Sequence, residues 1–135
     1  MKVFCSFAYT GEDPAVTAQR MNVVVDALLK RGHEAYCSSF DAEIQRLQEQ
    51  NDMKGVFTIA FKKLAASDVL VAIVASPNRS VGQLMEIGIA LSQNKKVYLF
   101  EHASASGTSY LPQLIDAHYT WNSLDELKQA LGQVA

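Results

Sequence analysis

The segment DVLVAIVAS, residues 68–76, constrains the fold of this chain more than any other stretch. Every residue from Val69 to Val74 is apolar, so both faces of an extended strand here would be apolar. Strands that are apolar on both faces are typical of the centre of a parallel sheet, because helices cover such a sheet on either side. The segment therefore predicts a central strand in an α/β fold.

Extended and helical patterns alternate along the rest of the chain. Further strands are predicted at residues 3–7, 33–38, 96–101 and 117–121, the last at an edge of the sheet. Helices are predicted at residues 14–31, 41–51 and 52–66, from the 77–82 turn to about 94, at 112–116, and after 123. This order predicts a doubly wound, flavodoxin- or Rossmann-like parallel sheet of five strands, with helices on both faces. The length fits one domain spanning residues 1–135.

Several helix ends carry recognisable signals. Asp13 precedes Pro14, which suits an N-cap followed by proline at the first helical position. Gly32 is a plausible stop for the same helix. Ser123 is followed three residues later by Glu126, which predicts a capping box. Gly55 marks a potential break in the third helix.

Charge and hydropathy exclude several classes of protein. The formal net charge is −2, so no nucleic-acid or membrane surface is indicated. No apolar run approaches the ~20 residues that span a bilayer. The first residues, MKVFCSFAYTGED, lack the pattern of a signal peptide, and we expect a cytoplasmic protein with Cys5 and Cys37 reduced.

No cofactor or metal site is indicated by the sequence. The three histidines, His33, His102 and His118, are far apart and form no local ligand pattern. Zinc sites usually show closely spaced His and Cys ligands, so a zinc site is not expected.

Three predicted loops follow strands and meet at the carboxyl edge of the sheet, where ligands bind in open α/β folds. They cover residues 8–13, 38–41 and 76–81. Glu86 follows the third loop closely, so we expect it in or near the first turn of a helix. Backbone N–H groups at such a helix start can hold an anion or a polar substrate.

Two interpretations of Glu86 follow from the residues alone. An acid near a helix N-terminus is favourable by a few tenths to about 1 kcal/mol without any catalytic role. Alternatively, Gly82 allows close approach of the backbone, and apolar neighbours line a pocket around the acid. Those neighbours are Val81, Leu84, Met85, Ile87, Ile89, Ala90 and Leu91. In that pocket Glu86 would be a partly desolvated nucleophile or base.

The stretch SDVLVAIVASPNRSVGQLMEIGIALSQNKKVYLF resembles the nucleoside 2-deoxyribosyltransferase superfamily, which includes the 2′-deoxynucleoside 5′-phosphate N-hydrolases and the CMP N-glycosidases. The shared pattern is an apolar strand after SD, then a serine, a glycine and a glutamate, and then EIGxA and a lysine. Its matches are Ser80, Gly82, Glu86, Gly88, Ala90 and Lys95 or Lys96. The opening VFCSFAYTGED also resembles the family's first strand and glycine-containing loop.

This resemblance implies chemistry at an N-glycosidic bond. Glu86 matches the glutamate that attacks or stabilises the anomeric carbon of a nucleoside while the base departs. Ser80, Val81 and Gly82 match positions that bind a 5′-phosphate or a sugar hydroxyl. Tyr9, Thr10 and Gly11 match the loop that lines the nucleoside pocket, where Tyr9 is expected to stack on a base or orient Glu86.

One position departs from the family pattern. The family usually carries an aspartate eight residues before the aspartate of SDVLV, and Ala60 stands there in this chain. General acid help is typically worth 10²–10⁴-fold in rate, so its loss would slow the reaction or require a better leaving group. Asp13, Asp41 and Glu43 remain open as substitutes.

Two other functions remain open. A Toll/interleukin-1-receptor-like domain that cleaves NAD would also begin with a strand ending in FxS and carry SP and a glutamate. Phe4, Ser6, Ser76, Pro77, Ser80 and Glu86 fit it loosely. The other hypothesis is a nucleotide-binding module without enzymatic activity, which Ala60 favours.

The resemblance also implies an assembly. Family members form dimers or larger homo-oligomers in which a neighbouring chain completes the pocket. The matching stretch here is SGTSYLPQL, so Ser109 or Tyr110 is expected to reach the site of a partner. The expected ligand is a small-molecule nucleoside or nucleotide.

Overall fold

The computed structural model describes residues 1–9 and 11–135. Its five strands form one parallel sheet in the order β2-β1-β3-β4-β5. Every residue of the middle strand β3 is buried, which confirms the interpretation of the DVLVAIVAS segment. The strands are β1 (Lys2–Phe7), β2 (Glu34–Cys37), β3 (Val69–Val74), β4 (Lys96–His102) and β5 (Ala117–Trp121).

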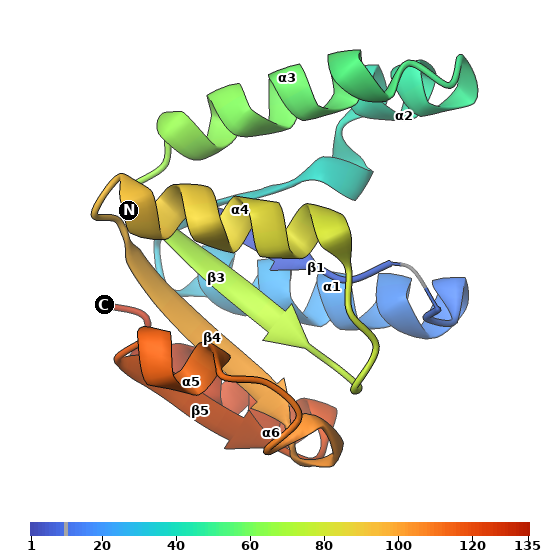
Figure 1. The fold of residues 1–135 in the computed structure, drawn as a ribbon. Helices are drawn as coiled ribbons and strands as arrows, with labels where there is room; N and C mark the ends of the chain where they lie inside the picture. The colour runs from blue at the N-terminus through green and yellow to red at the C-terminus, as the bar shows by residue number, and fades with distance from the viewer. Residues whose placement is uncertain (10) are drawn as a thin grey trace.

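Helices cover both faces of the sheet, as the alternating pattern predicts (Figure 1). They are α1 (Pro14–Lys30), α2 (Ala42–Glu49), α3 (Met53–Ala65), α4 (Val81–Ser92), α5 (Leu111–Leu114) and α6 (Leu124–Ala130). Three 3₁₀ turns, η1 (Ser38–Phe40), η2 (Ala103–Ala105) and η3 (Leu131–Gln133), complete the described elements. None of the described helices combines the length and the apolarity needed to cross a membrane.

The core has two layers, one on each side of the sheet. Buried residues of α1 and α6 pack on one face, and buried residues of α2, α3, α4 and α5 pack on the other. Because side chains alternate along a strand, Val3, Cys5 and Phe7 of β1 join the α1 layer while Phe4 joins the opposite layer. The same alternation turns Ser6 toward the α4 side.

The helix ends largely follow their sequence signals. The Asp13 carboxylate accepts the N–H of Val16 at 3.0 Å, and Gly32 closes α1 with a φ of +85°. The predicted break at Gly55 does not occur, because the Asp52 side chain accepts its N–H and α3 runs through it.

The capping box at the start of α6 is half formed. Ser123 accepts the N–H of Glu126 at 3.2 Å, as predicted. The Glu126 carboxylate, however, accepts the N–H of Asn122 instead of returning a bond to Ser123.

The strand order creates a topological switch point between β1 and β3. From β1 the chain crosses through α1 to β2 on one side, whereas β3, β4 and β5 follow one another on the other side. Open parallel sheets bind ligands in the crevice that forms where the direction of winding changes. The carboxyl ends of β1 and β3, which border this crevice, hold the candidate site.

Candidate active site

Glu86 points from α4 toward the sheet and is 8% exposed. Helix α4 begins at Val81, so Glu86 lies in its second turn, next to the first turn in or near which the sequence placed it. The favourable effect of a helix N-terminus on an acid falls off within the first turn, so it does not account for Glu86. The hydroxyl of Ser6 donates to Glu86 Oε1 at 2.7 Å, and Ser6 is 1% exposed. Glu86 is therefore an acid inserted into the protein interior.

The environment of Glu86 favours its protonated form. Burial raises the pKa of Glu86 to about 7, and the hydrogen bond from Ser6 acts in the opposite direction. A carboxyl group with a pKa near neutrality can exchange a proton or act as a nucleophile at physiological pH. Such a group is typical of a functional site, because burying an ionisable side chain lowers the stability of the folded protein.

Gln83 holds the two strands that border Glu86. It lies one turn before Glu86 on α4 and is 5% exposed. Its side-chain amide donates to the carbonyl of Ser6 at 3.0 Å and to the carbonyl of Ile73 at 2.9 Å. This amide therefore joins α4 to the ends of β1 and β3 and fixes the backbone that carries Ser6.

A cavity of about 400 Å³ opens in front of Glu86. Its walls come from the loops after β1 and β2, from α2 and α3, and from the start of α4. The lining residues are Phe7, Tyr9, Ser38, Ser39, Gln48, Met53, Val56, Phe57, Ala60, Ser80, Gly82, Gln83 and Glu86. Its size and its mixture of aromatic and polar groups suit a small heterocyclic ligand.

Four of the predicted site residues line this cavity, namely Glu86, Ser80, Gly82 and Tyr9. The Tyr9 hydroxyl lies 3.5 Å from Ser38 Oγ and 3.9 Å from Cys37 Sγ. It is not among the hydrogen-bond partners of Glu86, so Ser6 takes the orienting position that was expected of Tyr9.

Among the described residues, the predicted site residues Val81, Gly11 and Ser109 are not part of the cavity lining. The expectation that Val81, Leu84 and Met85 pack around Glu86 is wrong, because all three are exposed, Val81 to 73%. The ligand-binding role expected of Val81 stays a prediction. Gly11 shapes the loop instead, with a φ of +78° and a carbonyl that accepts the Asn78 amide at 3.1 Å. Thr10 lies outside the described residues.

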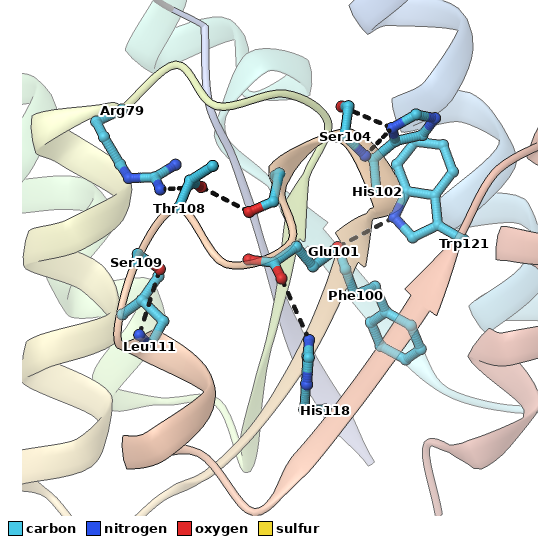
Figure 2. A network of polar contacts seen from close by, with 11 residues as sticks. Arg79, Phe100, Glu101, His102, Ser104, Thr108, Ser109, Leu111, His118 and Trp121 are labelled. Atoms are coloured by element: carbon cyan, nitrogen blue, oxygen red, sulfur yellow. Dashed lines mark hydrogen bonds and ion pairs between the residues drawn. The ribbon is translucent and has the colours of Figure 1, made fainter.

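Ser109 belongs to a loop that is tied down beside the start of α4 (Figure 2). The Arg79 guanidinium donates to Thr108 Oγ1 and to the Pro77 carbonyl, which holds this loop against the segment before α4. Ser109 Oγ accepts the N–H of Leu111 at 3.3 Å at the start of α5. In this chain Ser109 serves the local structure, and its reach to a partner remains a prediction.

The three candidate substitutes for the missing acid are engaged or remote. Asp13 caps α1, and Asp41 caps α2 while accepting the Tyr36 hydroxyl at 2.8 Å. Glu43 is exposed on α2. Among the described residues that line the cavity, Glu86 is the only carboxylic acid. Ala60 lines the same cavity.

Sequence reasoning assigned no part in this site to Ser6, Gln83 and Phe57. A serine inside the apolar strand VFCSF was a signal for Ser6, since a buried hydroxyl needs a partner. Gln83 precedes Glu86 by three residues, which places both on one side of a helix. No pattern pointed to Phe57, which reaches the cavity only through the packing of α3 on α4.

The chain was compared with known proteins. A family model described as nucleoside 2-deoxyribosyltransferase matches residues 5–115. A comparison with curated proteins gives no match.

Solved structures show the same fold at low sequence identity. The CMP N-glycosidase of Clostridium botulinum is 18% identical with a TM-score of 0.71, and the match covers 100% of each chain. A 2-deoxyribosyltransferase of Bacillus psychrosaccharolyticus is 16% identical with a TM-score of 0.64, covering 95% of this chain and 90% of that one. A conserved protein of Enterococcus faecalis V583 is 16% identical with a TM-score of 0.60, covering 100% and 99%.

Proposed function

This chain belongs to the nucleoside 2-deoxyribosyltransferase family, and on that premise we propose that it hydrolyses or transfers at the N-glycosidic bond of a nucleoside or nucleotide. The observation that carries the proposal is the buried Glu86, with its raised pKa, facing a cavity at the switch point of the sheet. This is the position at which the family pattern has its glutamate.

In the proposed reaction Glu86 acts on the anomeric carbon of the sugar. Ser6 holds Oε1, and among the described residues no donor contacts Oε2. Oε2 is therefore the oxygen that we assign to the sugar. Cleavage of the C1′–N bond develops positive charge on the sugar ring, and a carboxylate beside it stabilises that charge or bonds to C1′. Water or a second base then takes the sugar.

Other residues that line the cavity suit the sugar or phosphate end and the base end of such a ligand. Ser80 and Gly82 stand at the start of α4, where backbone N–H groups favour a sugar hydroxyl or a 5′-phosphate. Tyr9 and Phe57 offer aromatic surface at the other walls, which suits stacking of a planar base. We assign Val81, the first residue of α4, and Gly11, in the loop after β1, to the border of this ligand. The role expected of Thr10 stays a prediction.

The experiment that tests this function is chromatography of the protein incubated with nucleosides, ribo- and deoxyribonucleoside monophosphates, and NAD. Release of a free base from a nucleoside or nucleotide supports the proposal. Consumption of NAD, with no base released from any other nucleoside or nucleotide, including the cationic nucleoside nicotinamide riboside, would favour the Toll/interleukin-1-receptor-like alternative. Binding without release of any base would leave a nucleotide-binding module and contradict the enzymatic proposal.

We also propose that the protein forms a homodimer or a larger homo-oligomer. An exposed apolar row on α4, formed by Val81, Leu84 and Met85, supports this. Tyr110 and Leu114 are further exposed apolar side chains in the region that contains Ser109. Light scattering should give a multiple of the 14.8 kDa chain mass, and Leu84→Lys should lower it. A monomer at micromolar concentration would contradict the proposal.

A further inference from the structure

The contribution of α3 to the cavity wall is entirely apolar. It consists of Met53, Val56, Phe57 and Ala60. Ala60 is 3% exposed, so the wall at this position is a methyl group and not an opening for solvent. The α3 wall therefore presents carbon atoms to a bound base and supplies no proton donor at the position of Ala60.

The described residues that line the cavity offer no other strong proton donor. Glu86 is its only carboxylic acid among the residues that the structure describes, and it is assigned to the sugar. The phenol of Tyr9 also lines the cavity, but burial raises the pKa of Tyr9 above its ordinary value of about 10, so it is a weak acid at neutral pH. Asp13 and Asp41 are used as helix caps.

A missing acid matters only for some leaving groups. A neutral nucleobase that departs with the electron pair of the C1′–N bond becomes an anion unless it gains a proton. Help from a general acid at this step is typically worth 10²–10⁴-fold. A heterocycle that is already positively charged becomes neutral when it takes the electron pair, so it needs no proton.

We propose that the preferred substrates of this site are N-glycosides of a positively charged heterocycle, such as a pyridinium or an N-alkylated base. The inference rests on the proposed function. The C1′–N bond breaks and its electron pair cancels the charge of the heterocycle, while the Glu86 carboxylate bonds to C1′. Water then bonds to C1′, Glu86 leaves as a carboxylate, and one proton passes to solvent.

The charge of the lining supports the same class of ligand. Among the described lining residues there is no lysine, arginine or histidine, and the one ionisable carboxylate is Glu86. Tyr9 and Phe57 add aromatic surface, which attracts cations that lie over a ring face. A cationic heterocycle therefore gains both from Glu86 and from the aromatic walls, whereas an anionic base has no countercharge in the lining.

The test compares bases that differ chiefly in charge. The wild-type protein is incubated with 3-methylcytidine and cytidine, and with nicotinamide riboside and uridine, each in ribose and 2-deoxyribose forms. Free base is measured by chromatography after subtraction of spontaneous cleavage. We expect kcat/KM to be at least ~100-fold higher for the cationic member of each pair, in line with the loss of general acid help. Equal rates, or a preference for the neutral member, would overturn the inference while leaving N-glycosidic cleavage established.

A pair of variants at one position tests the cause. Ala60→Asp supplies an acid, and it should raise kcat/KM for cytidine at least ~10-fold without a matching gain for 3-methylcytidine. Ala60→Asn adds similar bulk without the acid and should give no gain. Equal gains for both substrates, or a gain with Ala60→Asn, would contradict the role given to the missing acid. If Ala60→Asp does not fold, the comparison of cationic and neutral substrates with the wild-type protein still tests the substrate preference.

Equilibrium binding separates this inference from the proposed function. If no substrate releases a base, the proposed function fails, and binding of 1-methylnicotinamide and nicotinamide to the wild-type protein then tests the cavity alone. Tighter binding of the cation by at least ~10-fold, lost in Glu86→Gln, would support a cation-selective cavity. Equal affinity for the two compounds would overturn the inference.

Discussion

Ser6 and Glu86 are 80 residues apart in the sequence, yet the Ser6 hydroxyl donates to the Glu86 carboxylate at 2.7 Å in a buried hydrogen bond. The bond joins β1 to α4 at the switch point of the sheet. It constrains one oxygen of Glu86 and opposes the rise in pKa that burial causes. The orientation and the ionisation of the proposed nucleophile therefore depend on a residue of the first strand.

Removal of this hydroxyl should change the pH dependence of the reaction. In Ser6→Ala the pKa of Glu86 should rise above its wild-type value, because a hydrogen bond that favours the carboxylate is lost. The acid limb of kcat/KM should therefore move to higher pH, with kcat lower by roughly 10-fold as a neutral-to-charged hydrogen bond disappears. A pH–rate profile provides the measurement.

Two further variants separate this role from packing. Ser6→Thr keeps the hydroxyl and should restore most of the acid limb. Ser67→Ala removes another buried serine hydroxyl, one that donates to the Lys63 carbonyl away from the cavity, and should leave the profile unchanged. If the acid limb does not shift in Ser6→Ala, the proposed effect of Ser6 on the pKa of Glu86 is contradicted.

The raised pKa of Glu86 should also appear in protein stability. Between pH 4.5 and about 7 the folded protein keeps a proton on Glu86 that the unfolded chain has lost, so the free energy of unfolding falls as pH rises. Below this window both states are protonated and the contribution is fully present. The loss amounts to about 3 kcal/mol at most across the window.

Glu86→Gln should abolish this part of the pH dependence. The glutamine has a similar shape and does not titrate, so its stability relative to the wild type should increase from pH 4.5 to pH 8. Denaturant midpoints of the two proteins across this range provide the measurement. Parallel stability curves would mean that the pKa of Glu86 is not raised in the folded protein.

Gly82 offers a way to narrow the cavity without harming the fold. An added Cβ would lie 3.4 Å from the Phe57 ring, an ordinary contact, and Gly82 lines the cavity. Because alanine is favoured over glycine in helices by up to ~1 kcal/mol, Gly82→Ala should fold at least as stably as the wild type. Its KM should nevertheless rise, by about 10-fold or less, since the methyl group occupies space for the ligand.

Gly88→Ala is the matched control on the same helix. An added Cβ at Gly88 meets no atom within 4 Å, and the position is exposed. KM should therefore stay at its wild-type value in this variant. If Gly82→Ala and Gly88→Ala change KM alike, the ligand does not occupy the cavity in front of Glu86.

Much of the fold follows from local patterns in the sequence. The apolar run of β3 and the alternation of strands and helices predict a parallel sheet, and Asp13 and Ser123 mark helix starts that the structure confirms. These features depend on neighbouring residues, and the sequence shows neighbours directly. Glu86 was recognisable because the spacing of Ser80, Gly82 and Glu86 is itself local.

The rest of the site depends on contacts between distant segments. Ser6 meets Glu86 only after β1 and β3 pair, and Phe57 reaches the cavity only after α3 packs against α4. The exposure of Val81 also depends on how α4 is rotated, and an apolar residue beside Glu86 in sequence can face either solvent or the sheet. A single sequence gives neither the pairing nor this rotation.

The central claim is that Glu86 acts on the N-glycosidic bond of a nucleoside or nucleotide. Its most direct test is the rate of free-base release by the wild-type protein and by Glu86→Gln, with the same substrate and with binding measured in parallel. We predict a fall in kcat of at least ~10³-fold with substrate still bound, because the amide keeps the shape of the carboxylate and loses its charge. Base release by Glu86→Gln at the wild-type rate would contradict the account.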